Sequence, residues 1–446
     1  MWCIPVYRAP CAPMSSTNSE MPRPSGRVHP RTVLLRIAPM RRLLVAIGWL
    51  LAMPCLAGPE TPYVPARDGI VLQTVASISD PRVRAFAALR TALDQDPHDV
   101  ARAVKLSEAY LDYGRDTGDA RYLGRAEAVI APWLARSPAP IPALLVHATI
   151  LQSRHDFTEA RAQLRSILER DNDNAQAWLT LATVAQVQSD MRTARQACAH
   201  LLTSSDPLIP GACLSSLNAV TGNADNAYRV LTTLWPQAHA EPVAVQSWIQ
   251  GILADTAKYL GDAAAADRHF RLALQLTPED NFLLADYGDF LLDQKRPQEA
   301  LDLLKNDSQS DTSFLRQVYA EVALGMPQAA TDTQQMASRF AALEVRGTRT
   351  YLREQAGFVL FVQHDPQRAL ELAQQNWTIQ HAPEDMRVFL AAALADGKPE
   401  AAQPVLDVLA MTHLQYPILV SLAAQVRAKM AAHAPPAASA PGRQDG

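Results

Sequence analysis

Apolar residues return every three or four positions along much of this chain, and the short phrases that hold them recur about every 34 residues. Each phrase ends in an alanine, as in DFTEA, DMRTA and RPQEA. The marker alanines are Ala126, Ala160, Ala194, Ala227, Ala266, Ala300, Ala330, Ala369 and Ala402, separated by 34, 34, 33, 39, 34, 30, 39 and 33 residues. Spacing of three and four places apolar side chains on one face of a helix. A period near 34 therefore predicts stacked pairs of helices.

Prolines support this register. A proline lies three residues before four of the marker alanines, at Pro297, Pro327, Pro366 and Pro399. Proline has no N–H and a fixed φ, which suits the first turn of a helix. Each is therefore predicted to begin the second helix of its pair. Pro132 and Pro404 lie further inside predicted second helices, where a kink or an early end is expected, and the 30-residue step before Ala330 predicts a shortened pair.

The pattern resembles the tetratricopeptide repeat family, whose unit is two antiparallel helices with a small residue at the eighth position and alanine at the twentieth. The segment from Ser247 to Asp280 fits best, with Ala266 and Phe270 in the expected places, and Gly288 is the eighth residue of the next unit. The resemblance covers roughly residues 66 to 410. It implies an all-α, right-handed superhelical solenoid of about nine helix pairs with capping helices, in which stacking of neighbours makes the core.

The N-terminal part has the pattern of an export signal. Residues 40–57 read MRRLLVAIGWLLAMPCLA, which is two arginines, an apolar run and a small-residue exit, as in a secretory signal peptide cleaved near Ala57. The run is about half the roughly 20 residues that a membrane span needs. Residues 1–39 are either a start codon placed too early or a long basic n-region. A periplasmic or secreted protein is expected, with a membrane contact only through an uncleaved leader or a lipid on Cys55.

The remaining boundaries follow from the repeat. Residues 58–97 are expected to be a linker and a degenerate N-terminal capping unit, and 98–410 the solenoid. Residues 411–432 are expected to form a C-terminal capping helix, and 433–446 a disordered tail.

Charge and cysteine content narrow the function. The whole chain has 41 Lys and Arg against 45 Asp and Glu, and removing the leader makes the balance more acidic, so a nucleic-acid partner is not expected. Only Cys198 and Cys213 remain after cleavage. They lie on helices that should be neighbours, so either a disulfide or two buried thiols fits.

No catalytic motif is present: the sequence lacks a phosphate-binding glycine loop, GxSxG, HExxH and CxxC. His155 beside Asp156 and His364 beside Asp365 are the nearest approaches to a metal or acid–base site. An aspartate between two helices is expected to be a helix N-cap, which explains both pairs without chemistry. No enzyme activity, metal or cofactor is predicted.

The resemblance implies a binding groove on the concave face, lined by positions two, five, nine, twelve and thirteen of the first helices. Aromatic rings beside acids at these positions suit an extended peptide with apolar and basic side chains. The alternative is that the rings are core and the acids a solvated face; Asp255 and Asp289 are expected to be exposed on either view. The candidate groove residues are Trp248, Asp255, Lys258, Tyr259, Phe282, Asp289, Asp293, Tyr351, Glu354 and Phe358.

These patterns favour an exported, non-catalytic scaffold that binds a protein or peptide partner in its concave groove. One alternative is a membrane-tethered assembly factor of an envelope machinery for polysaccharide, pilus or cytochrome biogenesis. Another is a small-ligand binder or enzyme inside the superhelix, with residues 235–243 as a lid.

Overall fold

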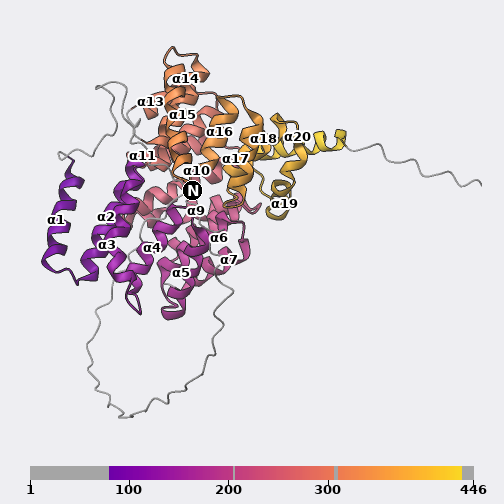
Figure 1. Cartoon of the computed structure of the whole chain (residues 1–446). Helices are drawn as coiled ribbons and strands as arrows, with labels where there is room; N and C mark the ends of the chain where they lie inside the picture. The colour runs from indigo at the N-terminus through magenta and orange to yellow at the C-terminus, as the bar shows by residue number, and fades with distance from the viewer. Residues whose placement is uncertain (1–79, 204–205, 306–309, 434–446) are drawn as a thin grey trace, which may run out of the picture. The chain divides into compact units, whose positions relative to one another are not determined.

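The computed structural model describes residues 80–203, 206–305 and 310–433, and within these ranges the chain forms helices and turns without strands. The helix pairs follow one another in chain order from α1 to α20 (Figure 1). The predicted signal peptide, Cys55 and nearly all of the predicted tail lie outside the described residues.

Nine helix pairs make up the described part of the stack, which confirms the all-α architecture of tetratricopeptide-type pairs. The first helices are α2 (Val100–Thr117), α4 (Ile141–Ser153), α6 (Ala175–Val187), α8 (Leu208–Ala219), α10 (Val243–Leu260), α12 (Asn281–Asp293), α14 (Asp311–Leu324), α16 (Leu352–Phe361) and α18 (Pro383–Ala395). The second helices are α3 (Arg121–Leu134), α5 (Phe157–Arg170), α7 (Met191–His200), α9 (Ala224–Leu234), α11 (Ala263–Leu276), α13 (Pro297–Leu304), α15 (Ala329–Val345), α17 (Pro366–Trp377) and α19 (Gln403–Thr412).

The remaining elements stand at the ends of the stack and between pairs. Helix α1 (Pro81–Gln95) precedes the first pair, and α20 (Pro417–His433) follows the last. Short 3₁₀ helices cover Leu201–Thr203 (η1), Trp235–Ala240 (η2) and Pro399–Ala402 (η3).

The marker alanines lie where the two helices of a pair meet. Except for Ala330, they expose at most 1% of their surface. At the eighth position the approach is just as close: a Cβ added to Gly288 would lie 3.0 Å from Cδ1 of Leu304. Small residues are therefore required at both positions because the helices cross at short range.

The pair containing Ala330 departs from the predicted register. Ala330 is exposed, and the buried face of α15 is made by Met336, Phe340 and Leu343. These three residues are separated by four and then three positions. A marker alanine and the two buried residues after it have the same spacing, as Ala160, Leu164 and Ile167 do on α5. Helix α15 thus packs on its neighbours with the face that carries Met336. The prediction that Ala330 is the marker alanine of this pair was wrong.

The prolines fall near the predicted boundaries. Pro297 and Pro366 are the first residues of α13 and α17, and Pro399 begins η3, whereas Pro327 lies in the turn before α15. The two internal prolines act as expected. Helix α3 ends two residues after Pro132, and the helix that contains Pro404 restarts as α19 after η3.

In eight pairs, the turn between the two helices has the same backbone feature. The residue five positions before the marker alanine has a left-handed backbone conformation. Glycine occupies four of these positions, and His155, Ser189, Lys295 and His364 occupy the others. In three of these turns the next residue is an aspartate whose side chain accepts from the first turn of the second helix, as Asp365 does from the Arg368 N–H. The two histidines singled out in the sequence are thus turn residues, although Asp156 makes no such cap bond.

Late pairs contact early ones across the inside of the stack. Arg387 of α18 forms an ion pair with Asp293 of α12, with Nη2 and Oδ1 2.5 Å apart, and the hydroxyl of Thr350 donates to the carbonyl of Arg154 over 3.4 Å. One apolar cluster joins residues of α6, α8 and α10 to residues of α16 to α20. The first helices consequently face an interior space that later pairs partly cover.

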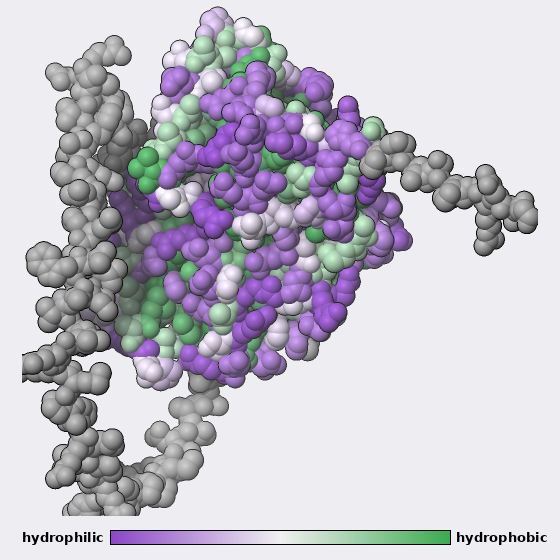
Figure 2. Space-filling view, turned by 45° about the vertical axis from the view of Figure 1, so that its right-hand side comes forward, coloured by the Kyte–Doolittle hydropathy of each residue, from purple (hydrophilic) through white to green (hydrophobic). Residues whose placement is uncertain are grey.

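Hydrophilic residues are interspersed with small apolar areas on the face seen in Figure 2. Within the described ranges, every helix is too short or too polar to cross a bilayer.

Candidate functional site: an interior channel

Two cavities lie along the inward faces of the first helices. The first has an empty volume of about 1050 Å³ and is lined mainly by α6, α8, α10 and the start of α18. The second, of about 1250 Å³, is lined mainly by α2, α4, α12 and residues 350–354. Asp286 of α12 lines both, so the cavities adjoin at this residue. We call the two cavities together the channel.

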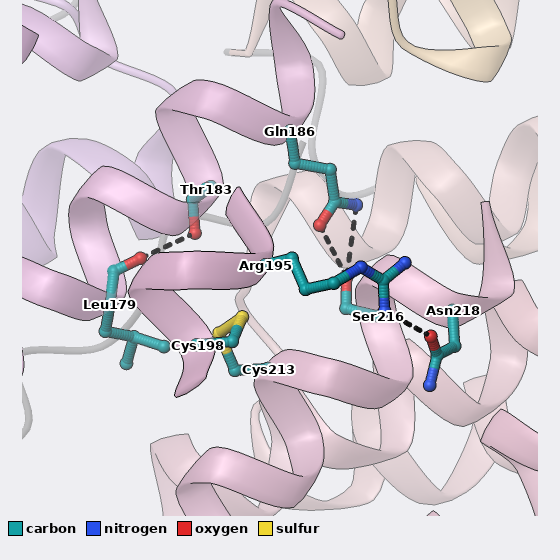
Figure 3. Close-up of a disulfide and its surroundings, with 8 residues drawn as sticks. All are labelled: Leu179, Thr183, Gln186, Arg195, Cys198, Cys213, Ser216 and Asn218. Atoms are coloured by element: carbon teal, nitrogen blue, oxygen red, sulfur yellow. Dashed lines mark hydrogen bonds between the residues drawn. A yellow bond between two sulfur atoms is a disulfide. The ribbon is translucent and has the colours of Figure 1, made fainter. Parts of the chain in front are cut away.

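The first cavity has mostly apolar walls, contributed by residues such as Leu179, Val220 and Ile252. Gln186 of α6 and Ser216 of α8 both line it and hydrogen-bond to each other, with the amide nitrogen 3.3 Å from the hydroxyl (Figure 3). Thr183 also lines this wall, and its hydroxyl donates only to the Leu179 carbonyl of its own helix.

Charge in the first cavity is concentrated around one lysine. Nζ of Lys258 lies 2.9 Å from Oδ1 of Asp255 and 3.6 Å from Oε1 of Glu384. Burial alone would lower the pKa of Lys258, but the two carboxylates raise it well above its usual value. For Asp286, burial raises the pKa to about 6, with Asp255 and Glu384 adding to the rise and Lys258 opposing it.

More of the residues that line the second cavity are polar. Gln152 lines it, is 3% exposed, and has no hydrogen-bond partner for its side-chain nitrogen. His155 also lines it; its Nδ1 is likewise unpartnered, and burial lowers its pKa to about 4. Glu354 contacts Arg353 through its carboxylate, and although burial opposes ionisation, this arginine lowers the pKa of Glu354 to about 2.

Six of the ten candidate groove residues line the channel. Trp248, Asp255 and Tyr259 line the first cavity, and Phe282, Tyr351 and Glu354 the second. These residues come from three different pairs, so the position rule carried over from the family does bring distant side chains to one enclosed space.

The other four candidates are placed differently. Lys258 stands behind the wall as a partner of two acids. Phe358 is 1% exposed and packs on Phe340 at 5.4 Å between ring centroids, so it is core. Asp289 and Asp293 line neither cavity.

The expectation that Asp255 and Asp289 are exposed was wrong. Their side chains are 18% and 30% exposed, and each is held by a more deeply buried cation. For Asp289 that cation is Arg316, with Nη2 2.6 Å from Oδ2. Introducing lysine at either position would place two cations together in a buried site, so charge reversal here is not a neutral surface change.

Several lining residues were missed by the sequence reasoning. Thr149, Thr183 and Ser216 stand at position nine of their units, and Gln152 and Gln186 at position twelve. The family's position rule would have found them had it been extended to the earlier pairs. His381 and Pro383 come from the connection into α18, for which the repeat period carries no signal.

Cys198 of α7 and Cys213 of α8 are joined in a disulfide, with Cα atoms 5.6 Å apart (Figure 3). Cys213 also lines the first cavity, so the bridge fixes part of the wall. Residues 235–243, expected as a lid, contribute nothing to either cavity lining; Ala238 is fully buried in the packing of η2. Across the described ranges, no three His, Cys, Asp or Glu side chains are grouped so as to hold a metal ion.

No family model matches this chain. Over 199 residues, or 42% of the chain, it is 29% identical to cellulose synthase operon protein C of Escherichia coli strain K12. The match spans only 16% of the length of that protein.

Among solved structures, the chain is similar to PilW, a type IV pilus biogenesis factor. The two are 14% identical, the match covers 45% of this chain and 94% of that one, and the TM-score is 0.37. A tetratricopeptide repeat protein from Parabacteroides merdae is 16% identical over 53% of this chain and 92% of that one, with a TM-score of 0.35. The Cut9–Hcn1 structure of the APC/C is 14% identical over 78% of this chain and 60% of that one, with a TM-score of 0.44.

Proposed function

We propose that this stack of tetratricopeptide-type pairs is an exported, non-catalytic scaffold that binds an extended segment of a partner protein inside its channel. The observation that carries the proposal is the succession of two cavities that adjoin at Asp286 along the inward faces of the first helices. Two adjoining cavities of this size suit an extended segment better than a folded domain.

The residues that line the channel also suit a peptide. The first cavity offers apolar walls for side chains, and the second offers hydroxyl and amide groups that can bond to a peptide backbone. The unpartnered nitrogen of Gln152 is a buried donor for which a carbonyl oxygen would be a suitable partner.

Two features support export. Residues 40–57 have the pattern of a secretory signal peptide, and the two cysteines that would remain after its removal are joined. Disulfides persist in oxidising compartments, so a periplasmic or secreted location agrees with both.

The test is a binding selection with blocked channels. The purified protein is used to select from displayed random nonapeptides, and the dissociation constants of enriched peptides are measured by fluorescence anisotropy. Thr183→Trp fills the first cavity and removes only a hydrogen bond within its own helix. Thr233→Trp is the matched control, because the hydroxyl of Thr233 makes the same kind of bond on an exposed face of α9.

We expect Thr183→Trp to weaken peptide binding about tenfold or more, and Thr233→Trp to change it less than about twofold. Equal binding by both variants would place the peptide outside the channel. If no peptide is enriched, the cavities hold a small ligand instead, or the partner is recognised by another surface.

A second candidate is a membrane-tethered assembly factor, favoured by the similarity to cellulose synthase operon protein C. In this case residues 1–57 would attach the protein to the membrane. It predicts that the native protein sediments with membranes and that Cys55→Ala or removal of residues 1–57 releases it. A protein that is soluble with its N-terminus cleaved near Ala57 would rule tethering out.

A further inference from the structure

The arginine side chains in and around the channel pair with acids of the same chain. Arg316 pairs with Asp289, Arg353 with Glu354, and Arg387 with Asp293. Arg115, at the rim of the second cavity, lies 3.5 Å from Asp116. Each of these guanidinium groups therefore already has an acidic partner.

The remaining acids gather where the cavities adjoin. Asp255, Asp286 and Glu384 all line the first cavity, and the single ammonium of Lys258 serves two of them. The Asp286 carboxylate has no hydrogen bond or ion pair to another described residue. Burial raises its pKa to about 6, with these two acids adding to the rise and Lys258 opposing it.

A second observation points to a ligand in the same space. Gln152 is nine-tenths or more buried, lines the second cavity together with Asp286, and has an unpartnered nitrogen. A buried donor without a partner costs free energy that a bound acceptor would recover. One occupant that extends from Gln152 to Asp286 would satisfy both.

We propose that Asp286 is the recognition point for a lysine or arginine side chain on the extended segment that occupies the channel, with the peptide backbone passing Gln152. The bound cation pairs with Asp286 and balances the acid surplus of Asp255 and Glu384. Apolar walls on the side of α6 and α8 hold the methylene groups of that side chain. An organic cation fits better than a metal ion, because the described acids form no cluster able to hold one.

This inference rests on the proposed function, so its test separates the two. The probes are nonapeptide libraries with one fixed central residue, which is lysine, arginine, norleucine or glutamate, and uncharged residues elsewhere. Retention of each library is measured on the full protein and on Asp286→Asn and Asp286→Glu. Asp225→Asn is the matched control, because it removes the same charge at an exposed residue of α9 that lines neither cavity.

The full protein should retain the lysine and arginine libraries about tenfold more than the norleucine library. Asp286→Asn should abolish that preference, while Asp286→Glu and Asp225→Asn should keep it. Circular dichroism and thermal melting establish that each variant is folded, which is expected because the Asp286 carboxylate bonds to no described side chain.

Retention of all libraries without a basic preference would overturn the role of Asp286 and leave the peptide scaffold standing. A basic preference that survives Asp286→Asn would place the cation at another acid. Failure to retain any library would remove the peptide scaffold, and the inference with it.

Discussion

The backbone N–H of His381, in the connection between α17 and α18, donates to the carbonyl of Val187, the last residue of α6, over 2.7 Å. The His381 ring strengthens this junction: its Nδ1 lies 3.2 Å from the carbonyl of Gln188, and the ring packs on Trp377 at 4.3 Å between centroids. The junction joins pairs that stand far apart in the chain, since 193 residues separate His381 from Gln188.

His381→Ala should loosen both sides of this junction. The change removes the ring contacts to Gln188 and Trp377, at a cost of about 1 to 2 kcal/mol. Hydrogen exchange followed by mass spectrometry should then show faster exchange in residues 376–386 and also at the end of α6. Peptides from α14 should be unchanged. Faster exchange confined to 376–386 would show that the junction does not hold α6.

Asp286→Asn should make the protein more stable at neutral pH. The pKa of Asp286 is about 6 in the folded chain against 3.8 for an ordinary aspartate, so the folded state binds the proton more tightly. The stability from that proton is fully present below pH 3.8 and is lost as the pH rises through 6. Asparagine cannot ionise and keeps the neutral-state stability at every pH.

The expected difference is therefore small at pH 4 and grows to about 1 to 3 kcal/mol in favour of the variant at pH 7.5. Urea unfolding of both proteins between these pH values measures it. A constant difference across the range would mean that Asp286 keeps an ordinary pKa. Addition of a bound basic peptide should narrow the gap at pH 7.5, because the cation stabilises the ionised carboxylate.

The corrected register in α15 is tested by placing leucine at two marker positions. Ala300→Leu overpacks a fully buried contact and should cost about 1 to 3 kcal/mol of unfolding free energy. Ala330→Leu adds a side chain to an exposed face and should change stability by less than about 0.5 kcal/mol. Met336→Ala should be as damaging as the first change. Equal sensitivity at Ala300 and Ala330 would restore the original register.

Loss of the disulfide should destabilise the central pairs. Replacing both Cys198 and Cys213 with alanine opens a cross-link across 15 residues and should cost about 2 to 3 kcal/mol by chain entropy. Chemical denaturation of the oxidised protein and of this variant provides the comparison. Thiol titration of the unreduced, unfolded protein without residues 1–57, which contain the other three cysteines, should find no free thiol; a titre of two would show that Cys198 and Cys213 are not bonded.

Much of the fold could be predicted because the repeat is local. Ala266, Gly288 and Pro366 each mark a close contact or a helix start within one pair, and such constraints leave a trace in the sequence at fixed spacing. Ala330 misled because its phrase copies the pattern, whereas the buried face of α15 begins six residues later at Met336. Apolar spacing in that helix would have revealed the shift.

The channel could be predicted only in part. Trp248 and Phe282 follow from position within a unit. The pairing of Asp293 with Arg387 does not, because it depends on how far the stack turns before a later pair meets an earlier one. That turning is the sum of many small rotations between neighbours, and no short stretch of sequence records it. The same sum brings Arg316 to Asp289.

The bond between His381 and Val187 also bears on how such a chain can change in length. An open stack accepts the duplication or deletion of a pair, since each pair meets only its neighbours. Here an extra pair between α13 and α16 would carry His381 past Val187 and part Arg387 from Asp293, while the cavities would lose one wall. Closure thus converts a modular array into a unit of fixed count, because gain or loss of a pair between these contacts would break them.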